Sequence, residues 1–228
     1  MKDIYVYEGT NILINKLGIK DEKELDSKES FVATLNTANL LKNGFNIKSV
    51  SDIKIIHKHL FGDIYEWAGQ NRKINMIKEE PVLNGLSVVY SNYRDIDNDL
   101  KKLDARFKSI DWKKLKHREA IDKLVIIISN LWQIHCFREG NTRTVTLFMY
   151  FLMKQIKMNV DTKFIGEHAK YFRNALVLAS IGQYSEYNYL TDILLDSISF
   201  KNIDKNKYQT IRDYEVEKYE YRAHKYKD

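Results

Sequence analysis

Apolar residues recur every three or four positions along most of the chain, and this spacing predicts amphipathic or buried helices. The sequence holds only nine glycines and one proline, which disfavours a turn-rich β protein. The pattern therefore predicts an all-α protein. The segments with helical spacing are residues 21–43, 51–61, 92–107, 117–134, 141–152, 164–180 and 184–199.

Two of these segments are apolar around most of their circumference. The first, 117–134, contains the run Leu124–Ile128, and the second begins at Asn141 and is rich in Phe, Leu and Val. A helix that is apolar nearly all round belongs at the centre of a domain. The polar residues between these two helices are therefore expected to lie at the heart of the fold.

Residues 72–90 have a different pattern. Two apolar stretches, Arg72–Ile77 and Val82–Tyr90, flank Pro81 and the pair Asn84-Gly85. Because Asn-Gly is a strong signal for a tight turn, this segment predicts a short β-hairpin in an otherwise helical protein.

Composition limits the domain organisation. A chain of 228 residues with 44% hydrophobic content suits one globular domain, which the pattern places at residues 1–200. Residues 201–228 are polar and rich in tyrosine, which predicts either a polar helix packed by its tyrosines or a mobile tail.

The net charge of +6 is spread over mixed-sign runs, which indicates solvated helix faces, with attraction to an acidic partner as the alternative. No nucleic-acid-binding motif occurs, so no nucleic-acid partner is predicted. Cys136 is the only cysteine, Met1–Gly9 lacks an apolar signal core, and the longest aliphatic run is too short to cross a bilayer. These features predict a cytoplasmic protein that does not enter a membrane, and a substrate of a specialised secretion system would have the same features.

The junction between the two apolar helices, His135–Arg143, concentrates polar and charged side chains. Such groups need partners when they are buried, and a ligand is one candidate. Gly140 permits backbone conformations that other residues avoid, and Asn141 is a suitable N-cap for the following helix. The amides of residues 140–143 would then form an anion site suited to phosphates, with Arg143 as a fixed cation.

Two further residues of this segment complete a reactive set. Glu139 lies at the edge of the expected anion site and is a candidate ligand for a Mg²⁺ ion that bridges phosphates. His135 is a candidate general base near neutral pH. A base, a metal ligand, an anion cradle and a cation within nine residues predict phosphoryl or nucleotidyl transfer.

The same segment resembles the signature of the Fic family, His-x-Phe-x-Glu-Gly-Asn-x-Arg, through His135, Phe137, Glu139, Gly140, Asn141 and Arg143. Residues His57–Gly69 are similar to the stretch that precedes the family's β-hairpin flap. The resemblance implies a Fic fold, a helical bundle core with the flap (about 72–90) over the active site. It also implies transfer of AMP from Mg-ATP to a Tyr, Thr or Ser hydroxyl of a target protein.

The resemblance also implies roles for individual residues. His135 would be the base, Phe137 would pack in the core, Glu139 would hold Mg²⁺, and Gly140, Asn141, Thr142 and Arg143 would bind the ATP phosphates. The flap residues Met76, Ile77 and Lys78 would border the nucleotide and hold the target segment as an added strand. The helix of residues 164–180 would border the adenine pocket through Tyr171 and Phe172, with Ser180 near its end, whereas core packing is the alternative for both aromatic residues.

One position departs from the family pattern. Thr146 stands where AMP-transferring members usually carry a second arginine, which contacts the terminal phosphate and, in autoinhibited members, pairs with a glutamate. The glutamate motif, Ser/Thr-x-x-x-Glu-Gly/Asn, has no match in the chain. UMP transfer, phosphotransfer and phosphocholine transfer therefore stay open, as does a degenerate domain that acts as a binding module or as half of a toxin–antitoxin pair.

The missing glutamate motif predicts restraint by a separate antitoxin-like protein or by homo-oligomerisation. Self-modification on the tail tyrosines is a further possibility, beside plain packing or exposure. Outside the motif, His57 and His59 are expected to serve helix packing or capping, because residues two apart on a helix diverge and cannot share a metal ion. Cys136 beside His135 has no orienting third group, which disfavours a cysteine hydrolase.

Overall fold

The computed structural model describes residues 3–199 and 206–211. Eight α-helices occur in this part of the chain, together with three single-turn 3₁₀ helices. The α-helices are α1 (Glu22–Asn43), α2 (Ile53–Phe61), α3 (Ile96–Lys108), α4 (His117–Ile134), α5 (Asn141–Gln155), α6 (Thr162–Glu167), α7 (Ala169–Leu178) and α8 (Asn188–Ser199). The 3₁₀ helices are η1 (Val50–Asp52), η2 (Pro81–Leu83) and η3 (Gly182–Tyr184).

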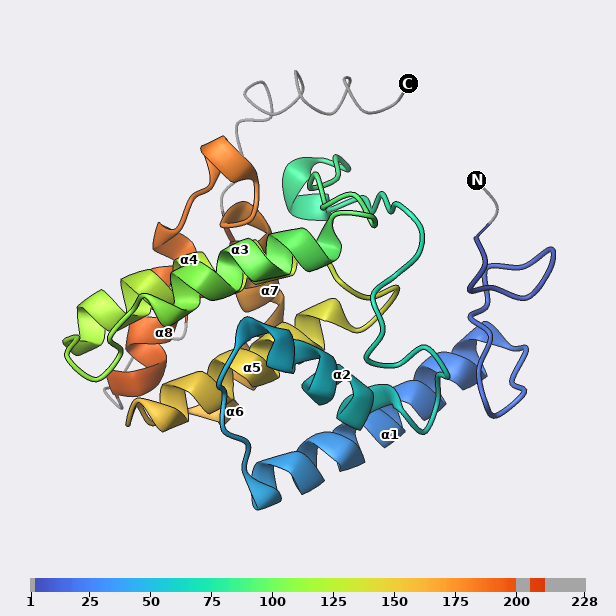
Figure 1. Ribbon diagram of the computed structural model, residues 1–228, viewed down its shortest axis with the longest axis horizontal. Coiled ribbons are helices and arrows are strands. Elements are labelled where there is room, and N and C mark those ends of the chain that lie inside the picture. The colour runs from blue at the N-terminus through green and yellow to red at the C-terminus, as the bar shows by residue number, and fades with distance from the viewer. Residues whose placement is uncertain (1–2, 200–205, 212–228) are drawn as a thin grey trace.

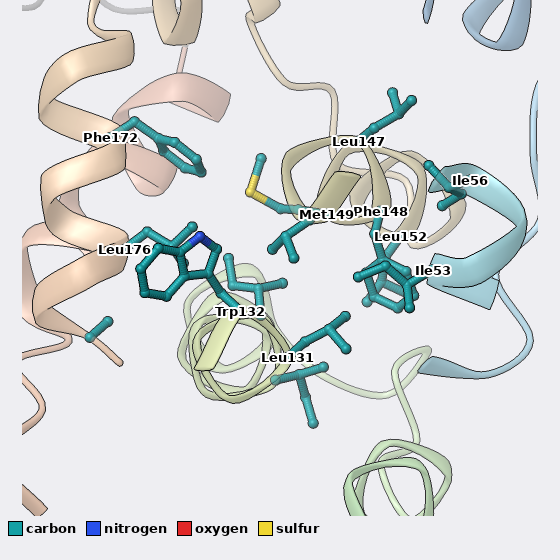
Figure 2. Packing of buried hydrophobic residues seen from close by; sticks show 14 of the residues in the cluster. Ile53, Ile56, Leu131, Trp132, Leu147, Phe148, Met149, Leu152, Phe172 and Leu176 are labelled. Atoms are coloured by element: carbon teal, nitrogen blue, oxygen red, sulfur yellow. The ribbon is translucent and has the colours of Figure 1, made fainter. Parts of the chain in front are cut away.

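Helices α4 and α5 lie at the centre of the bundle, as their apolar circumference predicts (Figure 1). On one side α5 packs against α2, which in turn packs against α1. On the other side α4 packs against α3, α7 and α8. Figure 2 shows the core between them, where Phe148 of α5 meets Ile53 of α2, and where Met149 of α5, Trp132 of α4 and Phe172 of α7 meet on the opposite side.

The all-α class is confirmed, and most helix bounds lie close to the predicted ones. The segment 164–180 is an exception, because it divides at His168 into α6 and α7. Helix α1 leaves two of its large apolar residues in contact with solvent. Phe31 and Leu35 lie on its exposed side, and its buried side is formed by Leu25, Glu29, Ala33 and Leu40.

The predicted β-hairpin does not form among the described residues. Residues 72–90 contain one isolated antiparallel bridge, between Glu79 and Ser87. The proline has no amide to donate to a strand ladder and begins η2 instead, and Asn84 closes that turn in the left-handed conformation. At the base of the segment, the buried guanidinium of Arg72 binds the carbonyls of Ile74 and Ser91, which a ladder would otherwise use.

The polar C-terminal segment, predicted as a helix or a mobile tail, lies mostly outside the described residues. Its described part includes Tyr208, which is buried. The Tyr208 ring packs edge-on against Tyr171, and its hydroxyl donates to Asp196 at 2.6 Å. None of the described helices is both long enough and apolar enough to span a bilayer.

Candidate active site

The path of the chain between α4 and α5 depends on two left-handed residues. His135 is the C-cap of α4 and has φ 52° and ψ 60°. Gly140, with φ 81°, is the N-cap of α5. A Cβ atom added to Gly140 would lie 2.5 Å from the Phe61 ring of α2, closer than any carbon contact allows. Glycine is therefore required at residue 140 both for the turn and for the close packing beneath it.

Asn141 is the first residue of α5, and the cap position is taken by Gly140. The prediction that Asn141 caps the helix is therefore wrong. Its side chain folds back instead, accepting from the Phe137 amide at 3.0 Å and donating to the Phe137 carbonyl at 2.8 Å. These two bonds close the turn 137–141 from inside and hold the start of α5 against it.

His57 of α2 supports the same turn from below, in line with the expected packing role. Its Nδ1 accepts from the Gly69 amide at 2.9 Å, so the proton is on Nε2, which donates to the Glu139 carbonyl at 3.0 Å. The ring stacks on Phe137 with centroids 3.8 Å apart. Burial lowers the pKa of His57 to about 4, so this imidazole is neutral. Its two hydrogen bonds hold the Glu139 carbonyl and the Gly69 amide in place.

Arg72 joins the turn to the 72–90 segment. It is 1% exposed, and its Nε donates to the His135 carbonyl at 2.7 Å, while its own amide donates to the Cys136 carbonyl at 2.7 Å. Its two terminal nitrogens bind the carbonyls of Ile74 and Ser91. The buried guanidinium of Arg72 thus links both ends of the 72–90 segment to His135, which precedes the turn 137–141.

His135 is held in a defined orientation by its neighbours. Its Nδ1 lies 3.2 Å from the Trp132 carbonyl, and the Tyr90 ring stacks on its imidazole with centroids 3.9 Å apart. A carbonyl can only accept, so Nδ1 carries the proton and Nε2 keeps a lone pair. Burial, together with the positive charges of Lys78, Arg72 and Arg173, lowers the pKa of His135 to about 3.

His135 borders a cavity of about 150 Å³ at the N-terminus of α5. The cavity brings together most of the predicted motif residues, and two cations from other segments complete its wall. Its lining residues are Lys78, Trp132, His135, Glu139, Gly140, Asn141, Thr142, Arg143 and Arg173. The first amides of a helix have no carbonyl one turn earlier to bind, and they carry the positive end of the helix dipole, so this wall suits an anion.

The donor set suits Mg²⁺ bound largely through a ligand. Glu139 contributes a carboxylate that is about one-third exposed at the cavity wall, where Oε1 accepts from the Gly140 amide at 2.9 Å. Among the described residues no cluster of three His, Cys, Asp or Glu side chains forms a metal cage. Mg²⁺ commonly keeps its waters and binds through one carboxylate plus phosphates, so one carboxylate beside an anion site fits this ion.

Arg143 is fixed by contacts with α1 and α2. Its guanidinium forms an ion pair with Glu29 of α1 and lies over the Phe61 ring at 4.7 Å from the centroid. Glu29 also accepts from the hydroxyl of Tyr65, and burial raises the pKa of that hydroxyl. Because a guanidinium has five donors, the ion pair leaves others directed toward the cavity that Arg143 lines.

The other predicted nucleotide residues lie in different places. Phe172 is packed in the core and borders a second, apolar cavity of about 380 Å³, which also contacts Thr142 and Thr146. Tyr171 packs on Tyr208, and the Ser180 hydroxyl is bonded to backbone carbonyls at Ser129 and Leu176. Neither Tyr171 nor Ser180 lines either cavity.

The three residues predicted to form the flap contact lie at two different sites. Lys78 lines the cavity beside His135, whereas Met76 and Ile77 border a separate groove of about 280 Å³ along residues 75–92. The Ile77 side chain is 71% exposed. Cys136 is buried, and burial raises its pKa to about 12, which leaves the thiol protonated and unreactive.

Four residues of the site carry no clear signal in the sequence: Glu29, Arg72, Tyr90 and Arg173. Each is a polar or aromatic residue whose neighbours in the site are far away along the chain. Glu29 offers the only hint, because it continues the spacing of Leu25 and Ala33 on the buried side of α1. A charged residue at an apolar position indicates a buried partner, but the pattern does not say which one.

Comparison with known proteins places this geometry in a family. Residues 48–153 match the model of the Fic/DOC family. The chain is 30% identical over 163 residues to the probable protein adenylyltransferase y4lH of Sinorhizobium fredii, covering 71% of this chain and 80% of that protein. It is 29% identical over 160 residues to the protein adenylyltransferase VbhT of Bartonella schoenbuchensis, covering 70% of this chain but only 32% of VbhT.

Solved structures agree with this assignment. The N-terminal FIC domain of the effector Bep8 from Bartonella sp. 1-1C matches with a TM-score of 0.72 and 25% identity, over 89% of this chain and 98% of that one. An effector FIC domain of Bartonella quintana, solved with bound ADP, matches with a TM-score of 0.69 and 24% identity, over 85% and 93%. The bundle, the motif turn and these relatives together show that the chain belongs to the Fic/DOC family.

Proposed function

We propose that this protein transfers AMP from Mg-ATP to a hydroxyl group of a target protein. The observation that carries the proposal is the cavity at the start of α5, where His135, Glu139 and the amides of residues 141–143 meet. The relatives described above are named protein adenylyltransferases, which supports the same activity.

The chemistry follows from the roles that these groups can take. The hydroxyl oxygen of the target attacks the α-phosphorus of ATP, the bond from that phosphorus to the β-phosphate oxygen breaks, and pyrophosphate leaves. The hydroxyl proton passes to Nε2 of His135, whose lone pair is available because Nδ1 holds the other proton. Stacking by Tyr90 keeps the imidazole from turning away.

The depressed pKa of His135 suits this role when nucleotide is bound. In the free protein, burial and three nearby cations keep the imidazole neutral. The negative charge of a polyphosphate beside those cations opposes their effect and raises the pKa of His135 toward neutrality. Because burial is the larger cause of the lowered pKa, the imidazole stays neutral and can accept a proton.

The phosphates are bound by the start of α5 and by Arg143. The amides of Asn141, Thr142 and Arg143 point into the cavity from the positive end of the helix, and the guanidinium adds directed donors. Glu139 would hold a Mg²⁺ ion, which would supply positive charge next to the phosphates.

The target segment binds in the groove along residues 75–92. Its apolar wall includes Met76 and the exposed Ile77, which suits an extended peptide whose side chains alternate between the wall and solvent. A peptide bound along this groove in an extended conformation would bring a Tyr, Thr or Ser hydroxyl to His135. Restraint by an antitoxin-like protein or by a second copy of the chain remains part of the proposal.

The experiment distinguishes AMP transfer from the other reactions of this scaffold. The purified protein is incubated with Mg²⁺, a lysate as acceptor source, and ATP labelled at either the α- or the γ-phosphate. The proposal predicts covalent α-label on protein and no γ-label. A γ-label alone would establish phosphotransfer, and label from UTP or a choline donor in place of ATP would establish a different transferred group.

The catalytic variant supplies the matched control. His135→Ala removes the base and is expected to reduce α-label by about a hundredfold or more. If wild type and His135→Ala both fail to label protein from any of these donors, the binding-module alternative holds and the transferase proposal fails.

A further inference from the structure

Thr146 of α5 borders the same apolar cavity as Phe172 of α7. Thr142, one turn earlier, accepts a hydrogen bond from the Trp132 indole at 3.0 Å and borders that cavity too. Arg143 also borders it, but its guanidinium is paired with Glu29 and lies over the Phe61 ring. The cation that the motif brings to this region therefore already has a partner on α1.

Two cations from outside the motif line the cavity at the start of α5. Arg173 follows Phe172 on α7, and its side chain lines the cavity together with Lys78 from the 72–90 segment. Both are close enough to His135 for their charges to act on its imidazole. Among the described lining residues, Lys78, Arg143 and Arg173 are cationic and Glu139 is acidic, so three sets of charged donors face one cavity even though two of the cations also have a carboxylate partner.

Arg173 is held in place by a buried carboxylate. Its Nη1 lies 2.7 Å from Oε2 of Glu80, and its Nη2 donates to Oε1 at 3.1 Å. Glu80 is fully buried, whereas the Arg173 side chain is 31% exposed. The ion pair and its hydrogen bond hold the guanidinium in position, and because a guanidinium has five donors, others remain for a ligand.

We propose that Arg173, with Lys78 beside it, binds the terminal phosphate of the nucleoside triphosphate and replaces the arginine that Thr146 lacks. This inference rests on the proposed function, because it concerns the same nucleotide. Arg143 then binds from the α1–α2 side and Arg173 from the α7 side, so the two guanidinium groups hold the polyphosphate between them. The pair with Glu80 makes the 72–90 segment part of the nucleotide site.

The test measures how strongly the protein prefers ATP to ADP. Dissociation constants for Mg-ATP, Mg-ADP and AMP are determined by calorimetry for the full chain and its variants. Arg173→Ala is expected to weaken ATP binding by about tenfold or more, the worth of one charge-assisted hydrogen bond, with a much smaller effect on ADP and AMP. Arg173→Lys keeps the charge without the fork and should lie between the two.

Two further variants separate a direct contact from a general charge effect. Lys170→Ala removes an exposed cation from the same helix and should leave all three constants unchanged. Thr146→Arg, introduced into Arg173→Ala, should restore the preference for ATP because it adds a long cationic side chain to α5 one turn after the residues that line the cavity. Since Arg173→Ala leaves Glu80 buried without its cation, the double variant Arg173→Gln, Glu80→Gln provides a version with no lone buried charge.

The outcomes are distinct from those of the transferase test. Equal weakening of ATP, ADP and AMP in the Arg173 variants, or no weakening at all, overturns this inference even if α-label transfer is intact. A selective loss of ATP binding upholds it even in a protein that shows no transfer, because the ratio of constants is measured without turnover.

Discussion

His135 and Gly140 both have positive φ values, 52° and 81°, and together they let the chain turn between α4 and α5 within a few residues. The first places the imidazole against Tyr90, and the second brings the backbone onto the Phe61 ring. At both residues a conformation that most side chains avoid is maintained by packing. Local strain of this kind is often found where a side chain or an amide must be aimed at a ligand.

Gly140→Ala tests this packing. The new methyl group would meet Phe61 at 2.5 Å in a backbone conformation unfavourable to alanine, so we expect a loss of about 2–4 kcal/mol in the free energy of unfolding. Displacement of the α5 amides should also lower α-label transfer by about a hundredfold. Urea unfolding and labelling measure the two effects.

Gly44→Ala is the matched control for this substitution. Gly44 has φ 74°, and nothing lies within 4 Å of the position its Cβ would occupy. It therefore carries the backbone cost alone, about 1 kcal/mol, and should leave transfer intact. Equal effects of the two substitutions would show that the contact with Phe61 does not shape the site.

Between elements, the 72–90 segment is attached to the helical core by side chains in place of a strand ladder. Arg72 binds three backbone carbonyls at its base, and Glu80 pairs with Arg173 of α7 farther along. Both contacts bury a charge with its partners, which makes each one costly to break. The position of the segment over the cavity therefore depends on two charged residues.

Arg72→Met keeps the bulk of the side chain and removes its donors. The carbonyls of His135, Ile74 and Ser91 would lose a charged partner, so we expect a loss of about 3 kcal/mol in the free energy of unfolding. Lys73→Met, at the exposed neighbour, should change the stability by less than about 0.5 kcal/mol. If both variants unfold at the urea concentration of the wild type, Arg72 has no such role.

The sequence predicts the helices well because their apolar spacing is a local property. It also predicts the polar segment between α4 and α5, where His135, Glu139 and Arg143 lie within nine residues of one another and meet in the cavity. The β-hairpin expected at residues 72–90 is absent: Asn84 and Gly85 do turn the chain in left-handed conformations, but Pro81 begins a 3₁₀ helix and the Arg72 side chain binds carbonyls that a strand ladder would use.

Contacts between segments that are distant in the chain could not be predicted from the sequence either. Arg173 meets Glu80 across 93 residues, and Arg143 meets Glu29 across 114. Helical spacing places each of these residues on a helix face, but the packing of α1 and α7 against the centre decides which faces meet. The contacts of the cations that line the cavity at the start of α5 therefore emerge only from the fold.

At the scale of the whole molecule, two buried neutral histidines lie at the centre of the bundle. His57 joins α2 to the motif turn, and His135 ends α4. Burial lowers their pKa values to about 4 and about 3, whereas an unfolded histidine has a pKa of about 6.5. Below pH 6.5 the unfolded chain therefore binds protons that the folded protein does not.

The fold should accordingly lose stability as the pH falls from about 6.5 to about 5, before carboxylates begin to titrate. Each histidine contributes a slope of up to about 1.4 kcal/mol per pH unit in this window. Urea unfolding at a series of pH values measures the slope, and His57→Gln should reduce it by about half. A free energy of unfolding that is constant between pH 7 and 5 would contradict the burial of these two side chains as neutral groups.

We propose above that the cavity at the start of α5 transfers AMP with His135 as the base. The most direct measurement is the rate at which α-labelled ATP marks protein in the presence of Mg²⁺, compared between the wild type and His135→Ala at equal nucleotide occupancy. We predict covalent label with the wild type, a rate lower by about a hundredfold or more in the variant, and similar ATP affinity in both. Equal rates in the two proteins, or label that comes only from the γ-phosphate, would contradict it.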